Sequence, residues 1–183
     1  ILNSANQAVE IGGNYGITAL DLMSLDEEGT YVLEISSYQL ERIPIIELDI
    51  SVLLNISPDH LERHGGMEGY IAAKKILFER IHENSITIVG MEDTYCRGIC
   101  MELMINRGCK NIVPISASAR IPGGIYIENG MLIDDLKNTR NVIMDLHSIS
   151  TLPGQHNWQN AAAAYAATSS IGVDPDIIIE GFK

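Results

Sequence analysis

The sequence is poor in basic residues and has no long apolar run. Its 183 residues include 12 Lys and Arg against 24 Asp and Glu, which gives a formal net charge of −12. A nucleic-acid surface needs clustered Lys and Arg, and the sequence contains no such cluster. A membrane-spanning helix needs about 20 consecutive apolar residues, and no run approaches that length. We therefore expect no nucleic-acid partner and no membrane span. The 46% hydrophobic content still allows one sizeable core.

Cysteines are also few. Cys96, Cys100 and Cys109 form no CxxC pair, and an odd count argues against a disulfide scaffold. We interpret them as reduced, partly buried thiols of a cytoplasmic protein. The sequence starts at Ile1 and shows no charged-then-apolar leader, so no targeting signal can be read. It also contains no GK[ST] phosphate-loop sequence. Internal repeats and low-complexity segments are absent as well.

Short apolar runs alternate with helical patterns in the first two thirds of the chain. The predicted strands are QAVEIGGN, YVLEISS, ISVLLNIS, SITIVG and NIVPIS. Helical spacing is found in YGITALDLMSL, in residues 67–83 and in residues 92–107. YVLEISS is almost wholly apolar, which is typical of a strand covered on both faces. This alternation predicts an α/β fold with a mostly parallel sheet flanked by helices.

The pattern changes toward the C-terminus. GGIYIENGMLIDD predicts a small antiparallel hairpin around Asn129-Gly130. LPGQHNWQNAAAAYAATSSIG predicts a helix, and a further helix begins with Asp174 as N-cap and Pro175 at its first position. We divide the chain into an α/β domain at residues 1–173 and a helix or linker start at residues 174–183. The opening ILNSANQ is interpreted as the tail of a helix, so we expect the chain to be part of a longer protein.

The predicted helix at residues 67–83 places one lysine on its apolar side. At about 100° per residue, Lys74 falls within the arc of Tyr70 and Leu77, whereas Lys75 lies at the edge, one turn before Glu79. Lys75 is therefore expected to pair with Glu79 across that turn. A charged amine at Lys74 must pair, must extend its tip to water, or must lose its charge.

Two polar residues stand where predicted strands end. Glu34 closes an apolar run, and His60 follows LLNIS in the same relation to its own strand. Parallel α/β folds bind ligands beyond the carboxyl ends of their strands. A buried Glu34 would require a cation, either Mg²⁺ or a basic side chain, and His60 is either a metal ligand or a hydrogen-bonded strand-end histidine. We predict that Glu34, His60 and Lys74 share one pocket where magnesium would bind.

A competing hypothesis treats the polar segment after LLNIS as a metal cluster by itself. It would use Asp59, His60, Glu62 and His64. The two histidines share a face only if DHLERH is helical, and Gly65-Gly66 argues against a long helix there. The order also differs from the HExxH pattern of zinc hydrolases.

Several motifs together resemble a known family. In order and spacing, the central domain of the Mur ligases is similar to IGGNYG, LEISSYQLE, NISPDHLERH, YIAAK and GQHNWQNAAAA. Mur ligases are bacterial, cytoplasmic, ATP-dependent enzymes that form amide bonds in peptidoglycan precursor synthesis. LEISSYQLE together with IGGN most resembles the member that adds D-glutamate to UDP-N-acetylmuramoyl-L-alanine. The resemblance implies a P-loop NTPase-like fold and a full-length protein that is monomeric. IGGNYG lacks the lysine of the phosphate loop, so we expect that loop and its strand before Ile1, with N- and C-terminal domains also outside this chain.

The resemblance also implies roles for the residues at the strand ends. Glu34 matches the glutamate that ligates the Mg²⁺ accompanying ATP, and His60 matches a histidine beside a second Mg²⁺ and the substrate. Lys74 matches a lysine that CO₂ converts to a carbamate, which would turn the inward amine into an anionic oxygen ligand. His60 and Lys74 are thus the expected catalytic residues.

Further positions match the family's ligand-binding residues. Asn157 and Asn160 match two asparagines that approach adenine, although the same amides could cap a helix instead. Asn14, Ser36 and Gln39 match residues near the UDP-N-acetylmuramoyl-L-alanine substrate.

The implied reaction has two steps. The substrate carboxylate attacks the γ-phosphate of ATP to give an acyl phosphate, and the amine of D-glutamate then displaces phosphate through a tetrahedral intermediate. The work of the protein is positioning and charge neutralisation. We expect these 183 residues to be inactive alone. The alternatives are a Mur-type ligase for another amino acid and a non-catalytic nucleotide-binding domain of the same fold.

Overall fold

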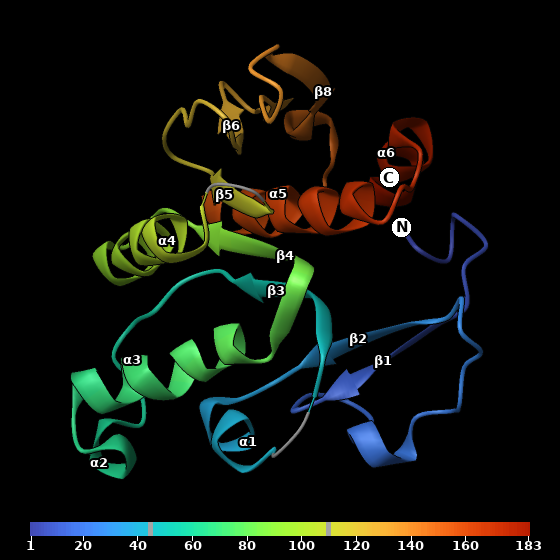
Figure 1. The fold of residues 1–183 in the computed structure, drawn as a ribbon. Helices are drawn as coiled ribbons and strands as arrows, with labels where there is room; N and C mark the ends of the chain where they lie inside the picture. The colour runs from blue at the N-terminus through green and yellow to red at the C-terminus, as the bar shows by residue number, and fades with distance from the viewer. Residues whose placement is uncertain (44–45, 109–110) are drawn as a thin grey trace.

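The computed structural model describes residues 1–43, 46–108 and 111–183 (Figure 1). Strands β1 (Val9–Gly13) and β2 (Thr30–Glu34) form a two-stranded parallel sheet. Six further strands form a second sheet in chain order: β3 (Leu48–Leu53), β4 (Ile81–Gly90), β5 (Ile112–Ser116), β6 (Ile125–Glu128), β7 (Met131–Asp134) and β8 (Asn141–Asp145). In this second sheet β3 to β6 are parallel, and β6, β7 and β8 are antiparallel. The mostly parallel α/β fold with a small antiparallel part is confirmed.

Six α-helices accompany the strands within the described residues. They are α1 (Ser37–Arg42), α2 (Leu61–His64), α3 (Met67–Lys75), α4 (Thr94–Arg107), α5 (Gln155–Ser170) and α6 (Pro175–Phe182). Short 3₁₀ segments lie at Ala19–Asp21, Ile76–Glu79 and Leu146–Ser148.

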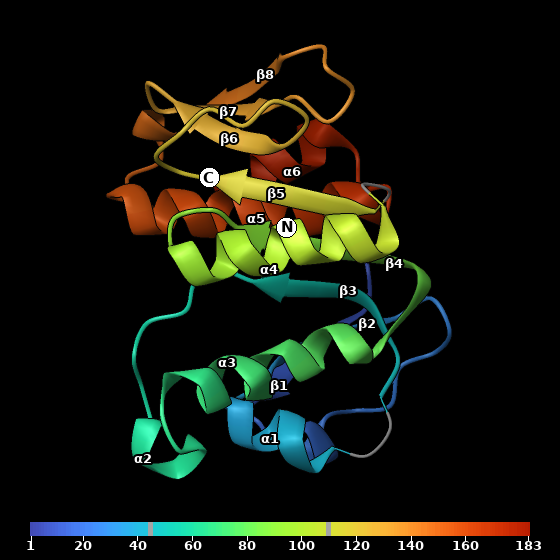
Figure 2. The same cartoon turned by 60° about the vertical axis from the view of Figure 1, so that its left-hand side comes forward.

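The larger sheet is covered on both faces. Side chains alternate along a strand, so Ile88 of β4 packs in one apolar cluster with the alanines of α5, and Val89 packs in another with α3 and α4. Both residues are fully buried. Figure 2 shows α5 and α4 on opposite sides of this sheet, with α1, α2 and α3 near the smaller sheet. The alanine-rich middle of α5 brings its backbone close to β4, β5 and β6.

Local signals located the hairpin and several helix ends correctly. Asn129 and Gly130 have φ values of 52° and 74° between β6 and β7, the conformation that favours an Asn-Gly hairpin turn. Asp174 accepts a hydrogen bond from the N–H of Asp176, and Pro175 is the first residue of α6. The start of a helix at residue 174 is therefore confirmed, while the domain boundary at 173 stays a prediction.

Other predicted elements were wrong in extent. The helix expected at residues 67–83 ends as α3 at Lys75, continues as a 3₁₀ turn to Glu79, and gives way to β4 at Ile81. YGITALDLMSL forms only the 3₁₀ turn Ala19–Asp21. Four of its large apolar side chains are exposed, Leu20 by 98%, and a short helix without a packed face is unstable. ILNSANQ is a series of turns, β8 was not predicted, and α1 was not predicted.

The parallel strands are divided between two separate sheets. Within the described residues β2 pairs only with β1, and β3 pairs only with β4. β2 is not covered on both faces either, because Tyr31 and Val32 are 46% and 44% exposed. An unpaired strand edge offers free N–H and C=O groups to another chain.

We expect the chain to self-associate through these edges as its concentration rises, which static light scattering would detect as a growing mean mass. Val52, a 39% exposed residue of β3, provides the test. A lysine there should disfavour edge pairing and lower the mass, whereas Val142→Lys on the other edge strand, β8, should not. A clean monomer of the unaltered chain at high concentration would contradict the expectation.

The structure also bears on the state of the cysteines and on the search for a membrane-spanning helix. Cys96 and Cys100 are buried and free of disulfides, and burial raises the pKa of the Cys96 thiol, with Asp93 adding to the effect. Cys109 lies outside the described residues. In the part of the chain that the structure covers, no helix has the length and apolar character needed to cross a bilayer.

Candidate functional site

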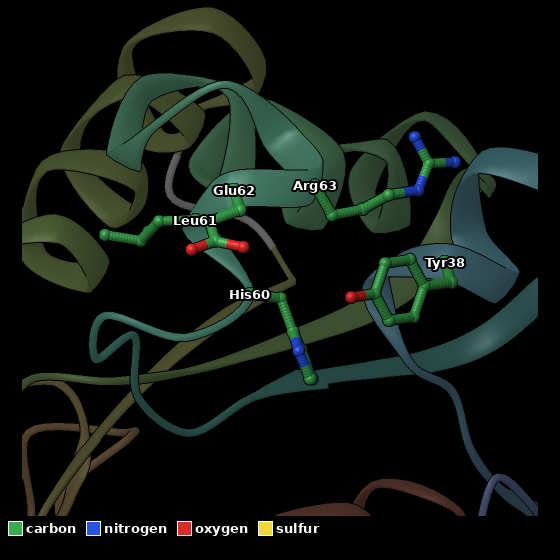
Figure 3. Close-up of a pocket in the computed structure, with 5 residues that line it drawn as sticks. All are labelled: Tyr38, His60, Leu61, Glu62 and Arg63. Carbon is green, nitrogen blue, oxygen red and sulfur yellow. The ribbon is translucent and has the colours of Figure 1, made fainter.

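A cavity of about 620 Å³ opens beside the start of α2, lined by Tyr38, His60, Leu61, Glu62 and Arg63. Figure 3 shows the ring of Tyr38, from α1, facing the side chains of His60 and Arg63. His60 has a left-handed backbone conformation, φ 51°, at the N-cap position of α2. That conformation is unusual for a residue with a Cβ atom, and it turns the chain sharply between Pro58 and the helix.

A line of ring contacts runs from this cavity to Lys74. The rings of His60 and Tyr38 have centroids 5.0 Å apart, and Tyr38 stacks on His64 at 5.4 Å with an interplanar angle of 15°. His64 in turn contacts Tyr70 at 5.4 Å, and Lys74 Nζ lies 5.1 Å from the centroid of that ring. Through three intermediate rings, the structure connects the two residues predicted to be catalytic.

Lys74 is half-buried, one turn after the buried Tyr70. In the described residues its ammonium has no carboxylate partner, and its contact with the face of Tyr70 is the cation–π kind. Lys75 behaves differently. Its Nζ donates to both carboxylate oxygens of Glu102 at 2.7 Å, so the predicted pairing with Glu79 was wrong. The turn to 3₁₀ geometry after Lys75 breaks the spacing on which that prediction depended.

Glu34 lies at the end of β2, but it is exposed rather than buried. Asn14 Nδ2 donates to Glu34 Oε1 at 3.3 Å, and the Asn14 N–H donates to the Glu34 carbonyl at 2.7 Å. The glycine before Asn14 makes this approach possible, because a Cβ on Gly13 would meet Glu34 O at 2.3 Å. An exposed carboxylate with one amide partner keeps lone pairs free for a hydrated cation.

Ser36 and Gln39 form the cap of α1. The Gln39 N–H donates to Ser36 Oγ at 3.3 Å, and the Ser36 N–H donates to Gln39 Oε1 at 2.9 Å. This reciprocal capping box begins the helix two residues after Glu34. It also accounts for both side chains without a ligand, so their proposed contact with substrate stays a prediction.

Asn157 and Asn160 lie in the first turns of α5. Asn157 Nδ2 donates to the Pro153 carbonyl at 2.8 Å, and Asn160 is exposed. Between them, the buried Gln159 donates to Leu54 O at 2.9 Å and to Glu92 Oε2 at 2.5 Å. Gln159 therefore fixes the start of α5 beside the carboxyl ends of β3 and β4, where nucleotide ligands bind in parallel α/β folds.

Glu92 and Asp93 order the loop after β4. Glu92 Oε1 accepts hydrogen bonds from Ser116 Oγ at 2.9 Å and from the Ala117 N–H at 2.6 Å. Asp93 caps α4 and also accepts from the Ile56 N–H at 3.0 Å. Burial alone would raise the pKa of the Asp93 carboxyl, but three backbone N–H donors outweigh it, and the pKa is lowered.

The metal cluster of Asp59, His60, Glu62 and His64 is not formed. Among the described residues no group of three His, Cys, Asp or Glu side chains is placed to hold a metal ion. His60 Nε2 lies 3.3 Å from Asp59 Oδ2, whereas the side chain of His64 is 1% exposed and turns toward α1. The cavity beside α2 is lined by His60 but by neither Glu34 nor Lys74. Glu34 ends a strand of the smaller sheet, whereas His60 follows a strand of the larger one. The meeting of Glu34, His60 and Lys74 in one pocket stays a prediction.

The sequence interpretation assigned no role to three residues that organise the site, namely Tyr38, Glu92 and Gln159. It considered His64 only as a member of a metal cluster, not as a buried contact between helices. No local signal shows that Gln159, on a helix, reaches strand ends that lie far away in the sequence. Their roles depend on which elements pack together.

Comparison with known proteins shows that the chain belongs to the Mur ligase middle-domain family, whose match covers residues 12–168. The resemblance identified from the motifs is thus confirmed. The UDP-N-acetylmuramoylalanine–D-glutamate ligase of Rhodospirillum rubrum is 47% identical over 180 residues, which cover 98% of this chain and 38% of that protein. The ligase of the same name from Caulobacter vibrioides (strain NA1000 / CB15N) is 44% identical over 179 residues, covering 97% and 38%.

Solved structures agree at the level of the fold. A UDP-N-acetylmuramoylalanyl-D-glutamyl-2,6-diaminopimelate–D-alanyl-D-alanyl ligase from Acinetobacter baumannii superposes with a TM-score of 0.56 at 19% identity, covering 86% of this chain and 34% of that one. MurF from the same organism gives 0.60 at 17% identity, covering 98% and 46%. The chain thus spans about two fifths of the length of the curated relatives it matches.

Proposed function

We propose that this chain is the central domain of a cytoplasmic bacterial ligase that joins D-glutamate to UDP-N-acetylmuramoyl-L-alanine at the expense of ATP. The observation that carries the proposal is 47% identity over 98% of the chain to a ligase of that name. The motifs around Glu34, His60 and Lys74 fall within the matched region. The reaction would pass through an acyl phosphate of the substrate carboxylate, which the amine of D-glutamate then attacks.

In this mechanism the side chains of this domain would hold the cations that neutralise negative charge during the reaction. Two Mg²⁺ sites would draw on the Glu34 carboxylate, the His60 imidazole and an oxygen of a carbamate on Lys74, and the bound cations would neutralise phosphate oxygens. The exposure of Glu34 and the lack of a carboxylate beside Lys74 within the described residues fit this assignment. The Tyr70 ring beneath Lys74 would hold its side chain in one direction.

The proposed nucleotide contacts come from the start of α5. Asn160 presents a free amide to solvent, and Asn157 keeps its carbonyl oxygen available because its hydrogen bond to Pro153 uses an N–H. Gln159 anchors this turn to the strand ends. An amide can donate to and accept from one edge of adenine, which is why these two side chains suit that base. Asn14, Ser36 and Gln39 would face the UDP-N-acetylmuramoyl-L-alanine side.

A chimera tests the proposal. We expect the Rhodospirillum rubrum ligase, with this chain in place of its matching segment, to release phosphate only when ATP, UDP-N-acetylmuramoyl-L-alanine and D-glutamate are all present. The isolated chain should release none with the same substrates, because it has no GK[ST] loop to hold the triphosphate. A chimera that folds but is inactive would favour the non-catalytic alternative, and turnover by the isolated chain would show that it needs no other part.

A further inference from the structure

We propose that His64, a residue given no role in the function above, positions the catalytic groups by joining α1 to α2 and α3 from inside the protein. The inference depends on the proposed function, because the groups it would position are His60 and Lys74. His64 is the last residue of α2, and its side chain is only 1% exposed. A buried imidazole needs partners for its polar atoms, and those partners define what it connects.

Both ring nitrogens of His64 face α1. Nε2 lies 3.0 Å from Ser37 Oγ, and Nδ1 lies 3.5 Å from Glu41 Oε1. The other carboxylate oxygen of Glu41 lies 3.6 Å from Arg63 Nη2, so Glu41 holds two neighbouring residues of α2. Although this set resembles a serine–histidine–acid triad, Ser37 is 3% exposed. The hydroxyl is thus shielded from solvent, and we assign the set a structural role.

The imidazole ring of His64 also contacts two aromatic rings. Tyr38 stacks on His64 nearly in parallel, while Tyr70 of α3 approaches it at an angle of 41°. The backbone permits this close packing through a glycine, since a Cβ on Gly69 would meet His64 O at 1.9 Å. His64 thus has contacts with α1 through its nitrogens and with both α1 and α3 through its ring.

These contacts place His64 at the centre of the ring line. On one side, Tyr38 lines the 620 Å³ cavity and contacts His60. On the other side, Tyr70 lies beneath the ammonium of Lys74. A shift in His64 would therefore move both predicted catalytic side chains, and errors of about 1 Å in such groups can cost about 100-fold in rate. Binding of ATP, assigned to the distant start of α5, should change little.

Three substitutions in the chimera separate positioning from bulk packing. His64→Phe keeps a ring but loses both polar contacts, and His64→Gln keeps a group able to bond to Ser37 but loses the stacking. We expect kcat to fall by about 10- to 100-fold in the first and less in the second, with KM for ATP within about threefold of the parent. Ser37→Ala should lower kcat in the same direction as His64→Phe, but by less. His82→Phe, at an exposed histidine paired with Asp49, is the matched control and should leave kcat unchanged.

A second measurement does not require turnover. In the 183-residue chain, the ring signals of His60 in an NMR spectrum should shift when His64→Phe or Ser37→Ala moves the Tyr38 ring, and they should stay in place in His82→Phe. Unchanged His60 signals in both variants, or an unchanged kcat, would overturn the inference. If His64→Phe does not fold, Ser37→Ala and His64→Gln decide by the same criteria. An inactive parent chimera would count against the proposed function alone, because the NMR result would still test the positioning role.

Discussion

Replacing Lys74 with alanine is expected to lower the ligase activity of the chimera by at least about 100-fold, a loss typical of removing one group that stabilises transition-state charge. Lys74 stands half-buried over the Tyr70 ring without a carboxylate partner among the described residues. A carbamate on its Nζ would present anionic oxygens at this place. A short carboxylic acid supplied in the assay could occupy the space left by the side chain, and we expect acetate or formate to restore part of the activity.

The neighbouring lysine provides the control for this experiment. Lys75 donates to Glu102 at 2.7 Å across an exposed surface, and exposed ion pairs contribute about 1 kcal/mol or less. Lys75→Ala should therefore keep activity within about threefold of the parent, and acetate should not change it. Full activity of Lys74→Ala without any added acid would remove the carbamate from the mechanism. Loss without rescue, with an intact fold, would favour a role for the amine itself.

The largest expected effect on stability concerns Gly90, the last residue of β4. A Cβ at this buried position would lie 1.9 Å from Leu54 O and 2.5 Å from Gln159 Nε2. These two atoms form the hydrogen bond that holds α5 to the end of β3. Gly90→Ala must separate strands and helix at a point with no free space. We expect it to lower the free energy of unfolding by about 3 kcal/mol or more, the upper part of the range for overpacked cores.

Urea unfolding followed by far-ultraviolet circular dichroism would measure this loss, or would show that no cooperative transition remains. Gly98 is the matched control, because it lies on the exposed side of α4 and a Cβ there would meet no atom within 4 Å. Gly98→Ala should stabilise the chain by about 1 kcal/mol, through helix propensity alone. A change below about 1 kcal/mol for Gly90→Ala would mean that the β3, β4 and α5 junction adjusts more easily than the distances indicate.

Elements with strong local signals were predictable from the sequence. The hairpin at Asn129-Gly130 and the capped start of α6 depend on backbone preferences of two or three adjacent residues, which any packing must respect. Elements whose stability depends on distant partners were not. YGITALDLMSL has helical spacing but forms only a short 3₁₀ turn. Strand β8 pairs with β7, although the residues of β8 carry no strand pattern from which that pairing could be predicted.

The candidate site divides in the same way. The inward direction of Lys74 follows from counting along a helix, and the motifs around Glu34 and His60 identify the family. The structure alone decided that Glu34 is exposed, that Lys75 binds Glu102, and that His64 is buried between α1 and α3.

By itself, then, the amino-acid order determined the α/β class, the turn and cap positions, and the set of polar residues available for chemistry. Tertiary packing decided how the parallel strands divide between two sheets, which side chains touch, and which are shielded from water. The reason is that helical and strand periodicities describe only a residue's own segment. Contacts such as Gln159 with Leu54, 105 positions apart, arise only after whole segments have packed.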